Sequence, residues 1–331
     1  MTILIGKERE TPLIVLKLEA LLRRIPTNHP QRLKIEESLR RYQAGYWGEQ
    51  SLDYHFNFLK DDDYIFFHGL RLPWINKLFF QIDSLLLTST CIILLEIKNM
   101  VGTIYFDIPF QQMIRTLDGK ETSFPCPIVQ SNRHVVQLTE WLRKNRFPNI
   151  PILNYVVFSN SSVILKTDPI HKHVFEKVLT AANLPNKLNA VRPSYPNIIL
   201  NKHKIDQLNN QFIQQHVSQD PDVIEKYGLE KSELLTGITC SKCNKLTIIR
   251  KNRNWLCPIC KSTFTDSHIQ LLIDYLLLIS PTITNKQFRY FSNLESPSIT
   301  TKLFQGMNFQ STGTYKNRQY QLSLDQIQHH L

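Results

Sequence analysis

The sequence predicts a mixed α/β core with a mixed sheet, followed by two smaller modules. Two apolar runs of strand length, residues 79–87 and 91–97, are separated by a short polar break. Four cysteines form two close pairs between residues 240 and 260, and three short helical patterns and a strand follow them. With 331 residues, of which 42% are hydrophobic, the chain can form two or three domains with cores of their own.

The two apolar runs should pair as a hairpin, and the register decides which charged residues meet. If the loop is centred between Ser89 and Thr90, facing residues have numbers that sum to 179, so Asp83 lies opposite Glu96. Strand alternation then places Lys98 on the same face. Facing carboxylates destabilise a sheet unless a cation compensates them, so the pattern favours a divalent metal. The alternative is a solvated Glu-x-Lys strand edge, in which the register is shifted.

Several segments together resemble the NERD (nuclease-related) domain, a branch of the PD-(D/E)XK nuclease superfamily. The segment "QIDSLLL" followed by "IILLEIKNMVGTI" resembles its signature of an Asp on one strand and a Glu-x-Lys on the next. "GYWGEQSL" contains the Gly48-Glu49 pair that opens the first core helix of the family, and "PIVQSNRHVVQLTEWL" resembles its later helix, with Gln130 at the motif position. The resemblance covers about residues 40–160 and implies a restriction-endonuclease-like core with the order α-β-β-β-α-β, its last strand at residues 152–159.

The resemblance also implies roles for individual residues. Asp83 and Glu96 would hold one or two Mg²⁺ (or Mn²⁺) ions, because hard divalent cations prefer oxygen ligands. Glu49 and the backbone carbonyl of Ile97 would help to hold the metal. Lys98 would orient a water molecule and contact the scissile phosphate, and Gln130 would position water or backbone from the neighbouring helix.

The cysteines in "CSKCNKLTIIRKNRNWLCPIC" predict a zinc ribbon. Cys240 and Cys243 form one Cys-x-x-Cys turn and Cys257 and Cys260 form a second, with 13 residues between the pairs. Two such turns can complete a tetrahedral four-thiolate site, which leaves no open position and is therefore structural. The competing interpretation is a pair of disulfides or a redox-active Cys-x-x-Cys.

Positive charge suggests a polyanionic partner. The chain has 39 basic and 28 acidic residues, a net charge of +11, which favours nucleic acid without proving it. The ribbon contains no acidic residue, and its expected contacts to nucleic acid are Lys242, Lys245, Arg250, Lys251 and Arg253. Trp255 lies among them, where it could stack on a base or fill the small core of the ribbon.

The tail resembles a winged helix. The segments "HIQLLIDYLLLI", "TNKQFRYFSNL" and "SPSITTKLFQGM" read as three helices, the last two with Thr and Ser caps, and "GTYKNRQYQLSL" reads as a strand. The third helix would then contact the major groove of DNA through Ser298, Thr300, Thr301, Lys302 and Gln305. The wing would contact the DNA backbone through Lys316 and Arg318. A small helical packing or dimerisation module is the alternative.

These readings give a domain order along the chain. We expect an N-terminal helical segment (1–39), a nuclease-like domain (40–183), a linker and helical connector (184–236), a zinc ribbon (237–265) and a winged-helix-like domain (266–331). The sequence shows no uninterrupted apolar run of 18 residues and no recognisable signal peptide, so we expect no membrane association and a cytoplasmic location.

The expected function is metal-dependent hydrolysis of phosphodiester bonds in nucleic acid. DNA is favoured over RNA because winged helices usually dock on duplex DNA. The alternative is a non-catalytic nucleic-acid-binding or regulatory protein that retains a nuclease-like fold.

Overall fold

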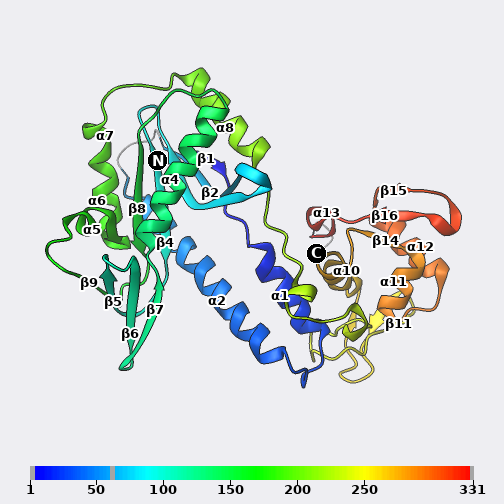
Figure 1. The fold of residues 1–331 in the computed structure, drawn as a ribbon. Coiled ribbons are helices and arrows are strands. Elements are labelled where there is room, and N and C mark those ends of the chain that lie inside the picture. The colour runs from blue at the N-terminus through cyan, green and yellow to red at the C-terminus, as the bar shows by residue number, and fades with distance from the viewer. Residues whose placement is uncertain (1–3, 60–63, 329–331) are drawn as a thin grey trace. The chain divides into compact units, whose positions relative to one another are not determined.

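The computed structural model describes residues 4–59 and 64–328, which divide into two compact units. Unit 1 contains residues 1–12 and 41–219, and unit 2 contains residues 13–40 and 220–331. Figure 1 shows the elements along the chain. The division does not follow the expected linear order, because an N-terminal segment belongs to the same unit as the C-terminal tail.

Unit 1 is built around a six-stranded mixed sheet with the order β1-β2-β3-β4-β8-β10. Strands β2, β3 and β4 pair antiparallel, whereas β1, β8 and β10 each pair with their neighbour in parallel. The strands are β1 (Leu4–Lys7), β2 (Ile65–Pro73), β3 (Phe79–Leu87), β4 (Ile92–Lys98), β8 (Ile152–Phe158) and β10 (Val178–Thr180). A mixed α/β core is therefore confirmed.

The β3–β4 hairpin has the predicted register. Ser84 pairs with Leu95 and Leu87 pairs with Ile92, so the residue numbers of facing positions sum to 179. The loop closes where Thr88 N–H donates to the Cys91 carbonyl at 3.0 Å, and the Thr88 hydroxyl accepts from the backbone N–H of Thr90 and of Cys91. Continuing this register places Asp83 opposite Glu96.

Helices cover both faces of the large sheet and bury its alternating side chains. On one face, α4 (Pro127–Lys144) and α8 (Lys202–Gln215) contribute Leu138, Trp141, Leu208 and Phe212 to the core; Figure 1 shows α4 crossing in front of the sheet. On the other face, α3 (Asp53–Phe56), α6 (Leu184–Asn189) and α7 (Val191–Ser194) pack over the strands. Because both faces are covered, the paired segments 85–87 of β3 and 92–95 of β4 are apolar and buried at every position.

Residues 184–215 differ from the expected linker. Leu184, Leu188, Leu208 and Phe212 are fully buried in the two core layers of unit 1. Pro185, Pro193 and Pro196 lie in and around the short helices α6 and α7, which cover the sheet. This segment completes the core because its leucines bury apolar surface that the sheet would otherwise expose to water.

A second, four-stranded sheet was not anticipated from the sequence. Its order is β7-β6-β5-β9, formed by β5 (Gly102–Asp107), β6 (Gln112–Leu117), β7 (Lys120–Pro125) and β9 (Val163–Thr167). Ile104, Phe106 and Met113 pack with Val156 and Phe158 of the main sheet in a separate apolar cluster. The strands β5 to β7 are therefore inserted between β4 and α4 of the expected order.

Unit 2 begins with α1 (Leu13–Arg24), joined by residues 25–31 to α2 (Arg32–Gln50), which ends in unit 1. The break between these helices has the sequence "IPTNHPQ", whose two prolines interrupt the helix. The short α9 (Val223–Lys226) follows residue 219, and three small strands form the cysteine-bearing module: β11 (Ile249–Lys251), β12 (Asn254–Leu256) and β13 (Thr263–Phe264). They pair antiparallel in this order.

The last part of unit 2 has three helices and a small antiparallel sheet. The elements are α10 (His268–Leu278), β14 (Thr282–Thr284), α11 (Asn285–Ser292), α12 (Pro297–Gly306), β15 (Ser311–Thr312), β16 (Gln319–Gln321) and α13 (Leu324–Gln328), with the sheet order β14-β16-β15. Thr284 and Ser296 cap α11 and α12 through their side-chain oxygens, as predicted.

One expected surface residue on α12 lies in the core. Thr300 is 0% exposed, and its hydroxyl donates to the Ser296 carbonyl. Thr300 is therefore unavailable to a DNA groove, which corrects the set proposed for this helix. The reason is helical spacing, because Thr300 lies one turn before the buried Phe304 on the same face.

Buried ion pairs tie α1 to α10 within unit 2. Arg24 Nε donates to Asp274 Oδ2 at 2.7 Å, and Arg23 Nη2 donates to Asp274 Oδ1 at 2.8 Å. Arg24 also donates to the Gly237 carbonyl at 2.6 Å and lies 4.8 Å from the centre of the Phe291 ring. Asp274, which interrupts the apolar helix "LLIDYLLLI", is therefore the buried partner of an N-terminal arginine.

We expect Arg24→Met to lower the free energy of unfolding of unit 2 by about 3 kcal/mol or more, because one partner of a buried pair would be lost. Arg23→Met is the matched control, since that side chain is partly exposed, and it should cost about 1 kcal/mol or less. Urea unfolding followed by the fluorescence of Trp255 measures both losses. Equal losses would contradict the account.

Candidate active site

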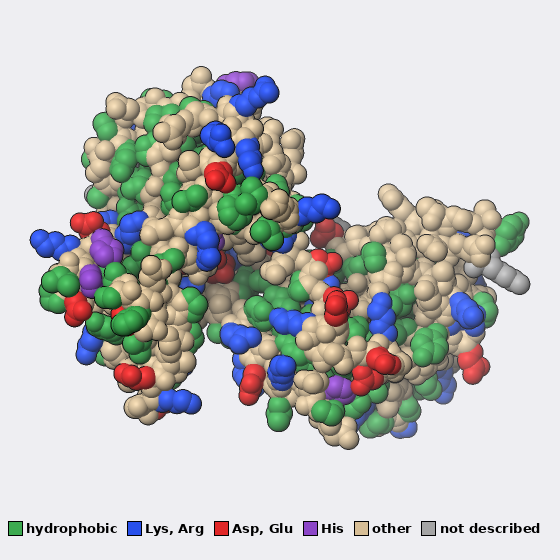
Figure 2. Space-filling view, in the orientation of Figure 1, with side chains coloured by type: hydrophobic (Ala, Val, Ile, Leu, Met, Phe, Trp, Pro, Cys, Tyr) green, Lys and Arg blue, Asp and Glu red, His purple; other side chains and the backbone are tan. Residues whose placement is uncertain are grey.

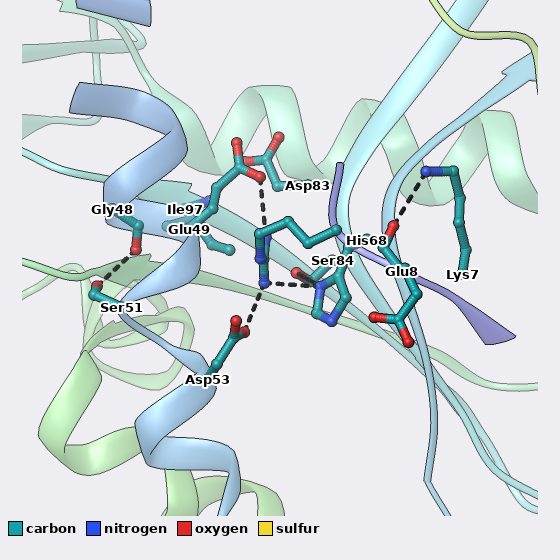
Figure 3. Close-up of polar contacts among 11 residues, drawn as sticks. Lys7, Glu8, Gly48, Glu49, Ser51, Asp53, His68, Asp83, Ser84 and Ile97 are labelled. Carbon is teal, nitrogen blue, oxygen red and sulfur yellow. Dashed lines mark hydrogen bonds and ion pairs between the residues drawn. The ribbon is translucent and has the colours of Figure 1, made fainter. Parts of the chain in front are cut away.

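Three carboxylates from separate elements lie near the end of β4. Asp83 comes from β3, Glu96 from β4 and Glu49 from the last turn of α2. Figure 3 shows the side chains of Glu49 and Asp83 beside each other. A Cβ added to Gly48 would lie 2.4 Å from Asn99 Cβ, so this glycine allows α2 to approach the end of β4 and bring Glu49 to the site.

The predicted basic and amide partners are also present. Lys98 Nζ donates to Glu96 Oε1 at 2.6 Å and to Gln130 Oε1 of α4 at 3.3 Å. Asp83 Oδ2 accepts from the backbone N–H of Ile97 at 2.8 Å. The fold thus links Glu96, Lys98 and Gln130 through hydrogen bonds and places Asp83 on the facing strand.

Burial and mutual repulsion make these carboxyl groups hard to ionise. Burial, helped by the negative charge of the neighbouring Asp83, raises the pKa of Glu49 and of Glu96 to about 8. Burial also raises the pKa of Asp83, although the Ile97 N–H opposes this change. A cation bound among them would favour their charged forms.

Glu96 has the properties of a metal ligand. Its side chain is 3% exposed, and Oε2 has no hydrogen-bond partner among the described residues. His134 Nδ1 of α4 lies 3.7 Å from this oxygen, too far for a hydrogen bond. An unpartnered buried carboxylate oxygen in a side chain that interacts electrostatically with Asp83 and Glu49 suits a hard divalent cation.

Arg9 is a site residue that the sequence reading missed. It follows β1, and its guanidinium donates to Glu49 Oε2 at 3.1 Å and to Asp53 Oδ1 at 2.9 Å. Its Nη2 also lies 2.8 Å from His68 Nδ1 of β2. Gly6 allows β1 to dock, because an added Cβ would lie 2.5 Å from the Phe67 ring. No local sequence motif predicts that Arg9 belongs to the site, because it is 40 residues away from Glu49 in the chain.

Two histidines border the carboxylates and are held neutral. Burial lowers the pKa of His68 to about 3, and Arg9 adds to this effect. Burial likewise lowers the pKa of His134 to about 4, helped by Arg133 and Lys98. His68 Nδ1 also contacts the Ser84 hydroxyl at 3.1 Å. Neither histidine was anticipated, because a lone His in an apolar pattern gives no distinctive signal.

The four cysteines of unit 2 converge as a second candidate metal site. Their sulfur atoms all lie within 4.8 Å of one another, with Cys240 Sγ 3.6 Å from Cys260 Sγ and Cys243 Sγ 3.6 Å from Cys257 Sγ. Zinc–sulfur bonds of about 2.3 Å imply a tetrahedron edge of roughly 3.8 Å. Hydrogen bonds from Thr247 and backbone N–H groups lower the pKa of the Cys257 thiol to about 6. The cluster is compatible with a structural zinc site.

The residues expected to contact nucleic acid differ in their exposure to solvent. Lys242, Lys245, Lys251, Arg253, Lys302 and Arg318 are exposed. Arg250 is half-buried, with its guanidinium 4.6 Å from the centre of the Trp255 ring. Trp255 is itself buried and its Nε1 donates to His268, so it fills the small core. The side chain of Lys316 lies outside the described part of the structure.

Basic residues are not gathered into a single patch on the face shown in Figure 2, where Lys and Arg side chains are scattered over each unit. No helix among the described residues is both long and apolar enough to cross a membrane. This face therefore offers no dense basic patch, and individual basic residues must be tested for binding.

Comparison with known families identifies the segment of the chain that contains the carboxylate site. Residues 44–159 match the family model of NERD, the nuclease-related domain. The match contains Glu49, Asp83, Glu96, Lys98 and Gln130, and it confirms the resemblance seen in the sequence. No curated protein and no solved structure gave a match to the chain.

Without divalent metal in the carboxylate site, stability should fall as pH rises from 6.5 to 8. The unfolded glutamates are already ionised there, whereas folded Glu49 and Glu96, with a pKa of about 8, still bind protons. Unit 1 should lose on the order of 1 kcal/mol per pH unit for each group. Below pH 6.5 the two buried histidines act in the opposite direction, which sets the lower limit of this window.

Glu96→Gln should reduce this pH dependence, and Glu121→Gln, at an exposed position on β7, should leave it unchanged. Urea unfolding of the zinc-loaded, Mg²⁺-free protein at several pH values measures the effect. A stability of unit 1 that rises between pH 6.5 and 8 would contradict the assigned electrostatics.

The cysteine site should hold one zinc ion per chain. Cys257→Ser should release the zinc and destabilise the small module, because metal coordination supplies folding free energy to a module of this size. Cys91→Ser, in the core of unit 1, is the control and should retain zinc. Elemental analysis of the purified proteins measures the stoichiometry, and oxidised cysteines without zinc would contradict the prediction.

Proposed function

We propose that the protein is a metal-dependent nuclease that hydrolyses phosphodiester bonds in nucleic acid. The observation that carries the proposal is the pair of the partly buried Asp83 and the buried Glu96, set on facing strands with Lys98 beside Glu96. This arrangement lies within the stretch that matches the nuclease-related domain. Carboxylates and one ammonium group at the end of adjacent strands supply the ligands and the cation that phosphoryl chemistry needs.

Each residue then has a chemical role. Asp83 and Glu96 would bind Mg²⁺ or Mn²⁺ with help from Glu49 and the carbonyl of Ile97. When bound, the ion would lower the pKa of a coordinated water and offset charge on the phosphate. Lys98 would contact the scissile phosphate and orient the attacking water.

Gln130 and Arg9 would support these groups. Gln130 accepts a hydrogen bond from Lys98, which restrains the ammonium group and leaves the Gln130 amide N–H groups to hold water or the nucleic-acid backbone. Arg9 donates to one oxygen of Glu49 and thereby leaves the other oxygen for the metal. The role of Arg9 is to position Glu49, because its guanidinium is buried among protein groups.

The tail would deliver the substrate. The order of α10, β14, α11, α12, β15 and β16, with β14 and β15 on either side of β16, supports a winged helix, and the cysteine cluster supports a zinc ribbon. We propose DNA rather than RNA as the substrate because winged helices usually dock on duplex DNA. The reduced cysteines that zinc binding requires also support a cytoplasmic location.

Glu96→Gln should abolish Mg²⁺-dependent cleavage, at least 100-fold, while it leaves the affinity for DNA nearly unchanged. The change removes one ligand charge and keeps the side-chain shape, so it affects the chemistry more than the basic surfaces. Supercoiled, linear and single-stranded DNA, each with Mg²⁺ or without added metal, are the substrates, and gel electrophoresis measures cleavage.

Glu121→Gln is the matched control and should cleave at the wild-type rate. Cleavage retained by a folded Glu96→Gln protein would exclude this site as the catalytic centre. Wild-type protein that binds nucleic acid and cleaves none would instead support a non-catalytic binding or regulatory role.

A further inference from the structure

A groove in the last part of unit 2 combines positive charge with an exposed aromatic ring. Its volume is about 870 Å³, and it lies between α11, the start of α12 and the loop that joins β15 to β16. The polar residues that line it include Lys286, Arg289, Thr301, Tyr315 and Arg318. Small-molecule sites have volumes of roughly 300–1,000 Å³, so this groove can accommodate one or two nucleotides.

The charge of the groove has one sign. Lys286, Arg289 and Arg318 contribute three cations, and no acidic residue is among the described residues that line the groove. Such a surface attracts phosphate groups through Coulomb forces that water screens only partly inside a concave site. The groove therefore favours a ligand with at least two phosphates.

Hydrogen bonds fix one wall of the groove. Arg289 Nε donates to Asn285 Oδ1 at 3.0 Å, and Arg289 Nη1 donates to the Glu295 carbonyl at 3.0 Å. Asn285 Nδ2 donates in turn to the Pro297 carbonyl and to the Thr301 hydroxyl. The guanidinium is thus held in place before a ligand arrives, which reduces the entropy lost on binding.

Tyr315 presents an aromatic face to solvent at the edge of the groove. Its side chain is 94% exposed, and its backbone has a φ of 47°, in the left-handed region that non-glycine residues seldom adopt. An exposed tyrosine ring gains little from packing on its own protein. It is well suited to stack on a nucleobase, whose flat faces are free only when the base is unpaired.

We propose that this groove binds a short unpaired stretch of nucleic acid, with Lys286, Arg289 and Arg318 on the phosphates and Tyr315 stacked on a base. The inference rests on the proposed function, in that it assumes a nucleic-acid substrate, and it adds a preference for single-stranded segments. It also assigns binding to α11 and the β15–β16 loop as well as to α12. Duplex DNA alone would satisfy the cations and leave Tyr315 without a partner.

Binding to the full-length protein without added Mg²⁺ tests the proposal. Fluorescence anisotropy of a labelled single-stranded 12-mer and of the matching blunt-ended duplex of two separate 12-mers, each at several salt concentrations, gives the affinities. The variants are Tyr315→Ala, Tyr315→Phe and the double change Lys286→Ala with Arg318→Ala. Lys302→Ala tests the contact expected for α12, and Lys34→Ala is the matched control, because Lys34 is an exposed cation on α2 that does not line the groove.

We expect the single strand to bind more tightly than the duplex. Tyr315→Ala should weaken single-strand binding about 5- to 100-fold, by loss of one stacking contact, without changing the salt slope, and Tyr315→Phe should restore it. The double variant should reduce the slope of log affinity against log salt by roughly 1.4, or 0.7 for each lost contact. Lys34→Ala should bind the single strand within about twofold of wild type, because this cation lies outside the groove and its removal leaves every residue of the groove in place.

The proposal is overturned if Tyr315→Ala binds the single strand as tightly as wild type, or if the double variant keeps the wild-type salt slope. It is also overturned if the duplex binds better than the single strand and only Lys302→Ala weakens binding. Because these measurements involve no cleavage, an inactive wild-type protein would reject the nuclease reaction and leave the binding result intact.

Discussion

The register of the β3–β4 hairpin is the constraint on which the candidate site depends. In this register Ser84 faces Leu95 and Leu87 faces Ile92. The next facing positions along the two strands are therefore Asp83 and Glu96. A shift of one residue would turn one of these carboxylates to the other face of the sheet and break the site. The apolar residues of both strands stabilise this single register, because helices cover both faces. Apolar packing therefore offsets the free-energy cost of the buried Glu96 and the partly buried Asp83.

Two basic side chains partly compensate the negative charge of these acidic groups. Lys98 pairs with Glu96 on one side of the site, and Arg9 pairs with Glu49 on the other. These cations reduce the repulsion but leave Glu49 and Glu96 with a pKa of about 8. A protein that needed only stability would replace such groups with apolar ones. Their retention at one end of the sheet is the physical basis for proposing a cation and a phosphate there.

Local patterns made much of the architecture predictable. The polar break at Thr88, Ser89 and Thr90 predicted the register of the hairpin. The Cys-x-x-Cys spacing predicted the four-sulfur cluster, and Thr284 and Ser296 predicted where two helices begin. In each case the interacting residues are close in sequence. The nuclease-related segment was recognisable for the same reason, since its signature residues lie on adjacent strands.

The features that sequence reasoning missed depend on contacts between distant residues. Arg9 reaches Glu49 because β1 pairs in parallel with β2, about 60 residues away. Arg24 meets Asp274 across 250 residues, so α1 belongs with the tail rather than forming a separate segment. Residues 184–215 were interpreted as a linker because prolines and polar residues separate their buried apolar side chains, among them Leu184, Leu188, Leu208 and Phe212. No local pattern distinguishes these outcomes.

The most direct measurement is a crystal structure of the zinc-loaded protein soaked in Mn²⁺, with anomalous difference maps recorded for manganese. Binding by carboxylates predicts a peak about 2.2 Å from oxygen atoms of both Asp83 and Glu96, and Glu96→Gln crystals should lose it. A map in which manganese occupies other carboxylates while the Asp83 and Glu96 oxygens stay without metal would contradict the central claim.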